Sequence, residues 1–192
     1  MAARAPRRTL LALLLAGCTS PAPVAKVAFG GGQMSPARSI LDNLADSAEH
    51  SFLVNALFKA GLGDRLDGSA PMTLFAPTNA AFALLPSGTV PPLLLPQNQA
   101  LLTALLSHLV VPGLHRVADL APGAMVVLNP LGGGALTLHR DAAGGWVSDS
   151  RASVRIAVAD LPAKNGLIQV LAGVPSAPLP PPTKPAPAKP PG

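Results

Sequence analysis

The sequence predicts one α+β domain, in which short N-terminal helices pack beside β-strands. Three observations predict this class. Apolar residues recur at helical spacing in segments between residues 40 and 109, and short apolar runs divided by glycine-rich turns dominate after residue 120. Segments rich in proline and glycine flank this centre on both sides. The 192 residues therefore leave room for one ordinary domain with a single core.

Two short helices are expected to open the domain. Ser39 to Asp42 form a capping box, and apolar residues follow it at helical spacing. A second helix is expected from about Ser51 to Gly61, because glycine adopts the left-handed conformation that ends helices. The apolar faces of the two helices consist of Ile40, Leu41, Leu44 and Ala48, and of Phe52, Leu53, Ala56, Leu57 and Ala60.

A short strand and two further helical segments are expected next. The strand covers residues 72–76 and is ended by Pro77, after which Thr78 or Asn79 can cap a helical turn. Asn98 is expected to cap a longer helix that the pair Pro112-Gly113 must end. The apolar positions of these segments are Ala80, Phe82 and Leu85, and Leu101, Leu102, Leu105, Leu106 and Leu109.

The remainder of the centre changes to the period of β-strands. Val154, Ile156 and Val158 alternate with Arg155 and Ala157, so one face of that strand should meet the core and the other should be wetter. The expected strands cover residues 125–128, 136–139, 146–148, 154–159 and 167–171, and they form a meander.

The N-terminus has the layout of an exported, lipid-anchored protein. Residues 1–17 combine early arginines with a seven-residue apolar run, which is too short to cross a bilayer. Leu15-Ala16-Gly17-Cys18 resembles the bacterial lipobox, in which the thiol of the cysteine receives a diacylglycerol. Alternatives are an ordinary signal peptide that contains a cysteine and a twin-arginine signal at Arg7-Arg8. Thr19 after Cys18, by resemblance to lipoproteins of diderm bacteria, favours the outer membrane.

The flanking segments and the charge balance bound the function further. Residues 18–35 are expected to form a flexible linker, residues 36–178 the folded domain, and residues 179–192 a proline-rich disordered tail. The folded part carries eight basic residues, since six of the 14 lie in the leader and flanks, against nine acidic ones. This balance lacks the basic footprint of a nucleic-acid-binding protein.

Three motifs resemble those of the fasciclin domain family. The run from Thr73 to Phe82 is similar to its first signature, and the run from Asn165 to Leu171 is similar to its second. Between them, residues 108–113 resemble the tyrosine-histidine segment of the family. The resemblance covers about residues 36–178. The family residues carried over, with structural or interaction roles, are Thr73, Phe75, Pro77, Thr78, Asn79, Phe82, His108, Pro112, Gly113, Asn165, Gly166, Ile168 and Val170.

The resemblance implies a fold and a class of function. The implied fold is a wedge in which short helices pack beside a twisted β-sandwich, and the implied role is adhesion or recognition at a cell surface. Ser107 stands where the family often has tyrosine, Gln169 replaces a common histidine, and Ala172 replaces a frequent acidic residue. The sequence also has no Arg-Gly-Asp, so integrin recognition is not carried over.

The sequence offers few residues for catalysis or metal binding. His50, His108, His115 and His139 have no metal-ligand spacing, and Cys18 is the only cysteine. His108 could be a ligand or a base, but packing and hydrogen bonding are the favoured reading. The aspartates that could pair, Asp141, Asp149 and Asp160, are expected at solvated turns, and the triple-glycine runs at residues 30–32 and 132–134 as tether and turn.

The sequence therefore predicts a non-catalytic adhesion or interaction module, anchored by lipid in the cell envelope at the outer membrane or cell surface, with a periplasmic orientation left open. We expect no cofactor, metal or nucleic acid. We expect a membrane attached through Cys18, a surface or matrix protein or polysaccharide as partner, and a monomer. The alternative is an envelope carrier of a small apolar ligand such as a lipid or pigment. A hydrolase is the third hypothesis.

Overall fold

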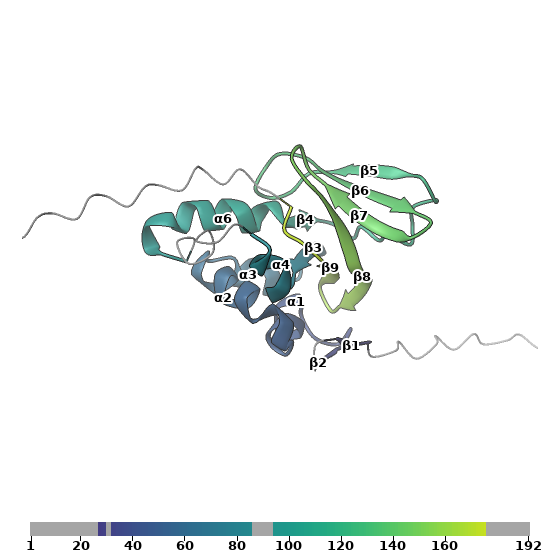
Figure 1. Cartoon of the computed structure of the whole chain (residues 1–192). Helices are drawn as coiled ribbons and strands as arrows, with labels where there is room; N and C mark the ends of the chain where they lie inside the picture. The colour runs from purple at the N-terminus through teal and green to yellow at the C-terminus, as the bar shows by residue number, and fades with distance from the viewer. Residues whose placement is uncertain (1–26, 30–31, 86–93, 176–192) are drawn as a thin grey trace, which may run out of the picture.

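The computed structural model describes residues 27–29, 32–85 and 94–175 of the chain (Figure 1). The helices are α1 (Ile40–Ala45), α2 (Ser51–Lys59), α3 (Gly63–Asp67), α4 (Asn79–Ala83) and α6 (Gln99–His108), with 3-10 turns η1 (Ala48–His50) and η2 (Pro96–Asn98). The strands are β1 (Val27–Phe29), β2 (Gly32–Met34), β3 (Met72–Pro77), β4 (Val110–Pro112), β5 (Met125–Leu128), β6 (Leu136–Asp141), β7 (Gly144–Ser148), β8 (Ser153–Ala163) and β9 (Gly166–Leu171). The predicted α+β class is confirmed.

The expected helix signals act where the sequence places them, with one correction. The hydroxyl of Ser39 caps α1 by accepting a hydrogen bond from the Asp42 backbone at 3.1 Å. Gly61 follows α2 with a φ of 70°, the left-handed conformation expected of it. However, α1 ends at Ala45, and Ala48 belongs to η1 instead. The chain turns there because the backbone of Ser47 bonds back to Leu44.

Strands β3 and β9 form the centre of the fold as a parallel pair. They run side by side from the pair Met72 and Gly166 to the pair Pro77 and Leu171. All six residues of β9 are buried, as are five of the six in β3. Burial on both faces is typical of parallel strands, which are covered by other elements on each side.

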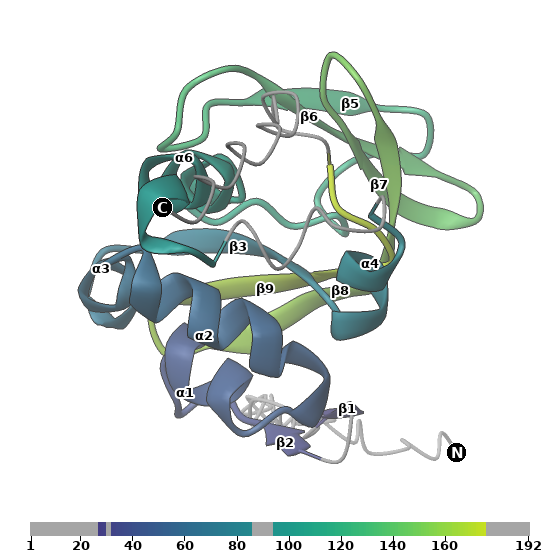
Figure 2. The same cartoon turned by 60° about the vertical axis from the view of Figure 1, so that its left-hand side comes forward.

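The main sheet has seven strands in the order β4-β3-β9-β8-β7-β6-β5. Strand β8 belongs to both halves of this sheet, and its pairing with β9 shifts register twice between Ile156 and Leu161. Such irregularities bend a strand, so β8 carries the chain from one half to the other. Figure 2 shows β5, β6 and β7 lying above β3 and β9, with α1 and α2 on the opposite side.

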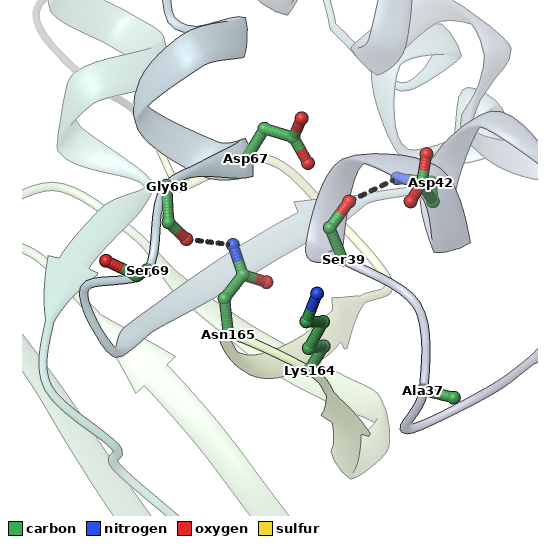
Figure 3. A pocket seen from close by; sticks show the side chains of 8 residues that line it. All are labelled: Ala37, Ser39, Asp42, Asp67, Gly68, Ser69, Lys164 and Asn165. Atoms are coloured by element: carbon green, nitrogen blue, oxygen red, sulfur yellow. Dashed lines mark hydrogen bonds between the residues drawn. The ribbon is translucent and has the colours of Figure 1, made fainter.

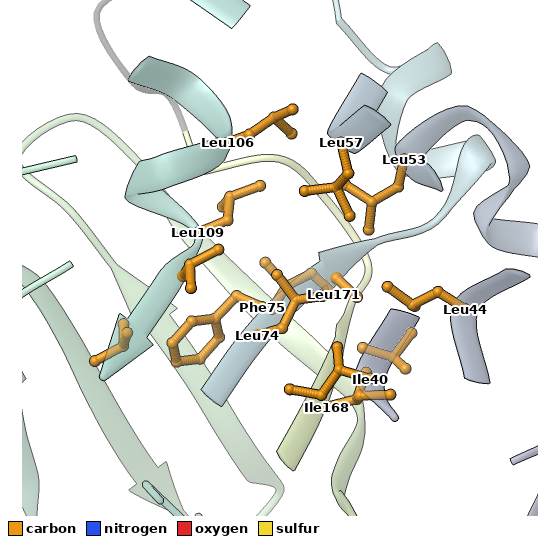
Figure 4. Packing of buried hydrophobic residues seen from close by; sticks show 14 of the residues in the cluster. Ile40, Leu44, Leu53, Leu57, Leu74, Phe75, Leu106, Leu109, Ile168 and Leu171 are labelled. Atoms are coloured by element: carbon orange, nitrogen blue, oxygen red, sulfur yellow. The ribbon is translucent and has the colours of Figure 1, made fainter. Parts of the chain in front are cut away.

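One hydrophobic core joins the helices to both halves of the sheet. Leu74 and Phe75 are adjacent in β3 and therefore point to opposite faces, and neither is exposed. Figure 4 shows side chains from α1, α2, α6, β3 and β9 converging around them. Leu138 of β6 and Val147 of β7 are also fully buried in this cluster. Aliphatic packing therefore carries most of the core, as the composition predicts.

The helix around residues 99–112 is shorter than expected. It ends at His108, and Val110–Pro112 form β4, which pairs antiparallel with β3. The prediction that the helix continues to Pro112-Gly113 is wrong because Val110 and Val111 gain strand pairing and burial beside β3. Asn98 stands at the N-cap position but makes no side-chain capping bond. The 3-10 turn η2 precedes the helix and gives Asn98 a φ of −105° and ψ of 10°, outside the extended capping geometry.

A small sheet lies where a flexible linker was expected. Strands β1 and β2 pair antiparallel within residues 18–35. The side chain of Met34 is 4% exposed and belongs to the core cluster, which ties this segment to the domain. The expected linker is therefore folded in its described second half. The leader, Cys18 and the tail at residues 179–192 lie outside the described residues.

Candidate functional site

The two signatures, which begin at Thr73 and Asn165, lie side by side in the structure. The first supplies β3 and the second supplies β9, so Phe75 is in register with Gln169. Ile168 and Val170 are fully buried, and Phe75 is 0% exposed. A Cβ on Gly166 would collide with the carbonyl oxygen of Met72 and lie 2.7 Å from Ile40 Cδ1, which explains glycine there. These motif residues build the core.

Asn165 holds two segments, the start of α1 and the end of α3, to the turn between β8 and β9. Its Oδ1 accepts a hydrogen bond from the backbone of Ile40 at 2.9 Å, and its Nδ2 donates to the carbonyls of Leu66 and Gly68 at 2.6 and 2.8 Å. The amide thereby satisfies the start of α1 and the end of α3, whose backbone groups lack helical partners. Its role is to hold the helices on the sheet.

A polar cleft of about 300 Å³ opens beside Asn165. Figure 3 shows Asp42, Asp67 and Lys164 around this opening, with the amide of Asn165 turned toward Gly68. The two carboxylates and the ammonium are on exposed residues, and the Ser39 hydroxyl is engaged in the cap of α1. Exposed charges of both signs can attract polar groups only weakly. No nucleophile with an adjacent base lines this cleft.

The end of the first signature connects α4 to α2 through hydrogen bonds. Thr78 caps α4 by accepting from the backbone of Ala81 at 3.1 Å. Asn79 instead reaches across to α2, where its Oδ1 accepts from the backbone of Phe52 at 3.0 Å and its Nδ2 donates to the Ala48 carbonyl. The expectation that either residue caps the local turn is resolved in favour of Thr78. Asn79 caps the neighbouring helix.

Aromatic packing also connects α4 to α2. The ring of Phe82 lies 4.5 Å from that of Phe52, measured between centroids. Phe82 is 3% exposed. A tilted aromatic pair at this distance adds to area burial, so α4 and α2 are held by both polar and apolar contacts.

Thr73, Pro112 and Gly113 form a second polar junction. The Thr73 hydroxyl donates to the Gly113 carbonyl at 2.7 Å and accepts from the His115 backbone at 2.9 Å. The His115 ring contacts the Pro112 carbonyl through Nε2 at 3.0 Å. Gly113 has a φ of 92°, a conformation that L side chains rarely adopt. The motif therefore fixes the exit of the chain from β4.

Gln169 and Asp160 make a buried connection that the sequence analysis missed. Gln169 is 0% exposed, and its Nε2 donates to Asp160 Oδ1 at 2.6 Å and to the His115 carbonyl at 3.1 Å. Asp160 also accepts from the backbones of Val117 and Ala118 at 2.8 and 2.9 Å. Asp160 keeps part of the predicted exposure, because these donors draw its carboxylate inward and leave the residue half-buried.

The signal for this connection was present in the sequence. A glutamine at position 169, inside an otherwise apolar strand, requires a partner when buried. Asp160 also has a φ of 58°, within the register irregularity of β8. The partner could not be identified without the bend of β8, which brings Asp160 opposite Gln169.

His108 lies at the end of α6, where its Nδ1 contacts the Gly133 carbonyl at 3.0 Å. The predicted hydrogen bonding is found at Nδ1, whereas Nε2 is buried without a hydrogen-bond partner among the described residues. Its Nε2 lies 4.0 Å from Asp149 Oδ2, too far for a hydrogen bond. The Asp149 side chain is 5% exposed and accepts from the backbones of Arg151 and Ala152, so its predicted solvation is wrong. Asp149 orders the β7–β8 turn.

The backbone around residues 132–134 approaches this histidine closely. A Cβ on Gly132 would lie 2.7 Å from the backbone nitrogen of His108 and 2.9 Å from the Ala104 carbonyl. The second triple-glycine run is therefore the turn that was predicted, and its first glycine permits contact with α6.

His50 is the most deeply buried histidine of the fold, with 0% exposure. Burial lowers the pKa of His50 from 6.5 to about 4, and a backbone hydrogen bond at Ala76 partly offsets this effect. Its Nδ1 lies 2.9 Å from the Ser47 hydroxyl. The neutral ring is a structural polar group between η1 and β3.

The outer face of β5, β6, β7 and β8 is the accessible surface that the sequence analysis did not find. His139 stacks on Trp146 with ring centroids 3.7 Å apart and planes 3° from parallel. Burial lowers the pKa of His139, whose Nε2 lies 2.9 Å from the Ser148 hydroxyl. Met125 and Val127 on β5 are 69% and 61% exposed. The four residues of β5 are all apolar, so the sequence shows no alternation that would reveal which of them face solvent.

The described cavities give little support to a carrier of apolar ligands. One groove of about 240 Å³ is lined in part by Leu94, Leu95, Pro96 and Leu102. Pockets for small molecules are usually larger, on the order of 300 to 1,000 Å³, and enclose most of the ligand.

Neither a metal cluster nor a membrane-spanning helix is found in the described part of the chain. Within residues 27–29, 32–85 and 94–175, no group of three or more histidine, cysteine, aspartate or glutamate side chains could hold a metal ion. None of the helices in that part of the chain is long and apolar enough to span a membrane.

Comparison with known proteins decides the family. The profile of the fasciclin domain matches residues 48–174, about two thirds of the chain. The chain belongs to the fasciclin domain family. The predicted resemblance is thereby confirmed, and both signatures lie within the matched region.

Two curated proteins of Synechocystis sp. are similar to this fasciclin protein. Protein sll1483 is 39% identical over 138 residues, which cover 70% of this chain and 71% of that protein. The uncharacterized protein sll1735 is 32% identical over 136 residues, which cover 71% of this chain and 96% of that protein. Neither name states a ligand or an activity.

A solved structure shows the same fold. It is a FAS1 domain pair from the insect cell adhesion molecule Fasciclin I, matched with a TM-score of 0.63 at 15% identity. The match covers 71% of this chain and 50% of that one, so this chain corresponds to about half of the pair.

Proposed function

We propose that this fasciclin protein is a non-catalytic interaction module that supports adhesion from a lipid anchor in the bacterial cell envelope. Membership in the fasciclin family is the observation that carries the proposal. The similar insect structure comes from a protein named a cell adhesion molecule, which is consistent with an adhesive role. Cys18 after Leu15-Ala16-Gly17 supports the anchor.

The arrangement of polar side chains supports a binding role over a catalytic one. The polar side chains of the signatures form hydrogen bonds with backbone groups of other segments. These side chains are Thr73, Asn79, Asn165 and Gln169. Catalysis requires an available nucleophile or base within reach of the other groups. Two serine hydroxyls lie 2.9 Å from a histidine ring, but Ser47 and His50 are buried in the fold, and the ring of His139 beside Ser148 is stacked on Trp146. His108 and Asp149 are 4.0 Å apart and contact backbone groups.

Deletion of the gene tests the adhesive role. We expect the deletion strain to adhere less to surfaces or to neighbouring cells, and expression of the intact chain to restore adhesion. Unchanged adhesion in the deletion strain under all conditions tested would reject this function.

The anchor has a separate test in the variant Cys18→Ser. The intact chain should fractionate with membranes and incorporate labelled fatty acid, whereas Cys18→Ser should lose the label and leave the membrane fraction. Retention of the label by Cys18→Ser would contradict acylation at that residue. Release of an unlabelled intact protein would instead support an ordinary signal peptide.

A further inference from the structure

Strand β5 ends the seven-stranded sheet, and in the described part of the chain no other segment pairs with its outer edge. The Arg140 backbone donates to the Ala124 carbonyl at 3.0 Å, so the backbone of Ala124 faces β6. Backbone groups of an antiparallel strand alternate between its two edges. Val126 and Leu128 therefore bond to β6, while the N–H and C=O groups of Met125 and Val127 point to the free edge.

The opposite edge of the same sheet is protected. In β4, Val110 and Val111 are each 1% exposed, and Pro112 has no N–H. The backbone of Leu131 also donates to the Val110 carbonyl at 2.9 Å, which covers the outer edge of β4. Proteins commonly protect sheet edges with proline, lysine or a covering loop, and β5 has none of these along its four residues.

The side chains on β5 extend the same surface. Met125 is paired with His139, His139 with Trp146, and Trp146 with Arg155, so these four side chains form one row across the outer face. Arg155 forms an ion pair with Asp141 at 2.8 Å, which balances the charge at the far end of the row. The parallel row runs from Val127 through Thr137 and Ser148 to Ser153, so the outer face next to β5 combines apolar with uncharged polar side chains.

The position of β5 leaves this edge accessible. Figures 1 and 2 both place β5 at the end of the domain opposite β1 and β2, where the described chain begins. A protein tethered through its N-terminus would direct β1 and β2 toward the attachment point. The free edge of β5 would then face away from it.

We propose that β5 receives an extended, uncharged segment of a partner polypeptide, which adds a strand to the sheet. Backbone groups of Met125 and Val127 would supply the hydrogen bonds, as in other cases of strand addition. The partner segment should be uncharged, because Met-Val-Val-Leu has no group to pair with a charged side chain, and an unpaired charge is costly to remove from water. Partner residues on the inner side should be apolar, to continue the surface of Val126 and Leu128. This assignment rests on the proposed interaction function and names its partner class.

A synthetic peptide that alternates threonine and valine can test the edge. Methylation of every second backbone nitrogen leaves one hydrogen-bonding edge free, which prevents the peptide from stacking on itself. We expect this peptide to slow amide exchange at Met125 and Val127 of the full chain at least about tenfold by NMR. A peptide methylated on every nitrogen should leave both rates unchanged, because it cannot form the ladder.

Two variants separate backbone pairing from side-chain contact. Val127→Pro removes an outward N–H without removing a bond to β6, and should abolish protection at Met125. Val127→Ala keeps the backbone and should weaken peptide binding severalfold. Phe58→Ala is the matched control, since Phe58 of α2 is also 61% exposed, and it should not change binding. Trp146, the only tryptophan, reports whether each variant keeps its fold.

Several outcomes would overturn this assignment. One is equal protection in Val127→Pro and the intact chain, and another is protection confined to residues away from β5. Protection that rises with protein concentration in the absence of peptide would identify a second copy of the chain as the occupant. A Trp146 response to neutral dextran without amide protection would identify a polysaccharide surface.

The failure of this surface is distinguishable from the failure of the proposed function. If deletion of the gene lowers adhesion and the Val127→Pro strain adheres normally, the edge is rejected and the adhesive role stands. If deletion has no effect on adhesion, the proposed function is rejected whatever the peptide does.

Discussion

The two ends of the main sheet differ in what their side chains do. At the β3 and β9 end, both faces are buried, and the polar side chains of the two signatures bind backbone groups of neighbouring segments. At the β5 to β7 end, one face is buried and the other carries Met125, Val127 and the stacked pair His139 and Trp146. The recognisable motifs therefore hold the fold together, and the accessible surface lies elsewhere.

The physical cause is the way each end is covered. The parallel pair of β3 and β9 has helices on one side and the bent half of the sheet on the other, so its polar groups need internal partners. The antiparallel strands β5, β6 and β7 need only one buried face. Their other face is free to vary without loss of the core.

The largest contrast between the ends should come from truncating one large apolar side chain in each. Phe75→Ala should lower the free energy of unfolding by about 4 kcal/mol, because it leaves a cavity in a fully buried site. Met125→Ala should lower it by less than about 0.5 kcal/mol, since that side chain is 69% exposed. Urea unfolding of both variants measures the difference. Similar losses for the two would contradict the separation of the ends.

A smaller contrast is expected between polar side chains. Asn165→Ala removes bonds to Ile40, Leu66 and Gly68, and should cost about 3 kcal/mol because partly buried backbone groups lose their partners. Ser148→Ala removes one contact to His139 on the outer face and should cost less than about 1 kcal/mol. Equilibrium denaturation at neutral pH compares them. A neutral effect of Asn165→Ala would show that water replaces its bonds.

Protonation of His50 should have the smallest effect on stability at neutral pH, and this effect should grow as the pH falls. Its folded pKa of about 4 lies below its ordinary value of 6.5, so the unfolded chain binds more protons between these values. Stability should therefore fall as the pH drops from about 6.5 to about 4, by at most about 3 kcal/mol. Unfolding curves at several pH values measure this slope.

Two variants assign the slope to its source. His50→Gln should flatten the dependence between pH 6.5 and 4, whereas His139→Gln should retain it, because His139 lies on the outer face. The pKa of His139 is also lowered by burial, so its titration should alter Trp146 fluorescence in the intact chain below pH 6.5. A slope that persists in His50→Gln would place the acid sensitivity in other groups.

Elements marked by local signals were predictable. Ser39, Gly61 and Thr78 act within their own turns, and the strands from β5 to β9 begin or end within a few residues of their expected bounds. Strand β4 was missed because Val110 and Val111 follow a leucine-rich helix without a break. Its pairing with β3 is separated by more than thirty residues, and such contacts leave no periodic pattern.

The sequence by itself determined the class of the fold and the short-range caps, because periodicity and turn chemistry depend on neighbouring residues. Its signatures carried the resemblance to the family. Only the tertiary structure decided that Asn79 caps α2, that Asp160 bonds to Gln169, and that no other described strand pairs with the outer edge of β5. Each of these depends on which distant segment satisfies a backbone group. That choice is made when the sheet bends at β8 and closes over one core.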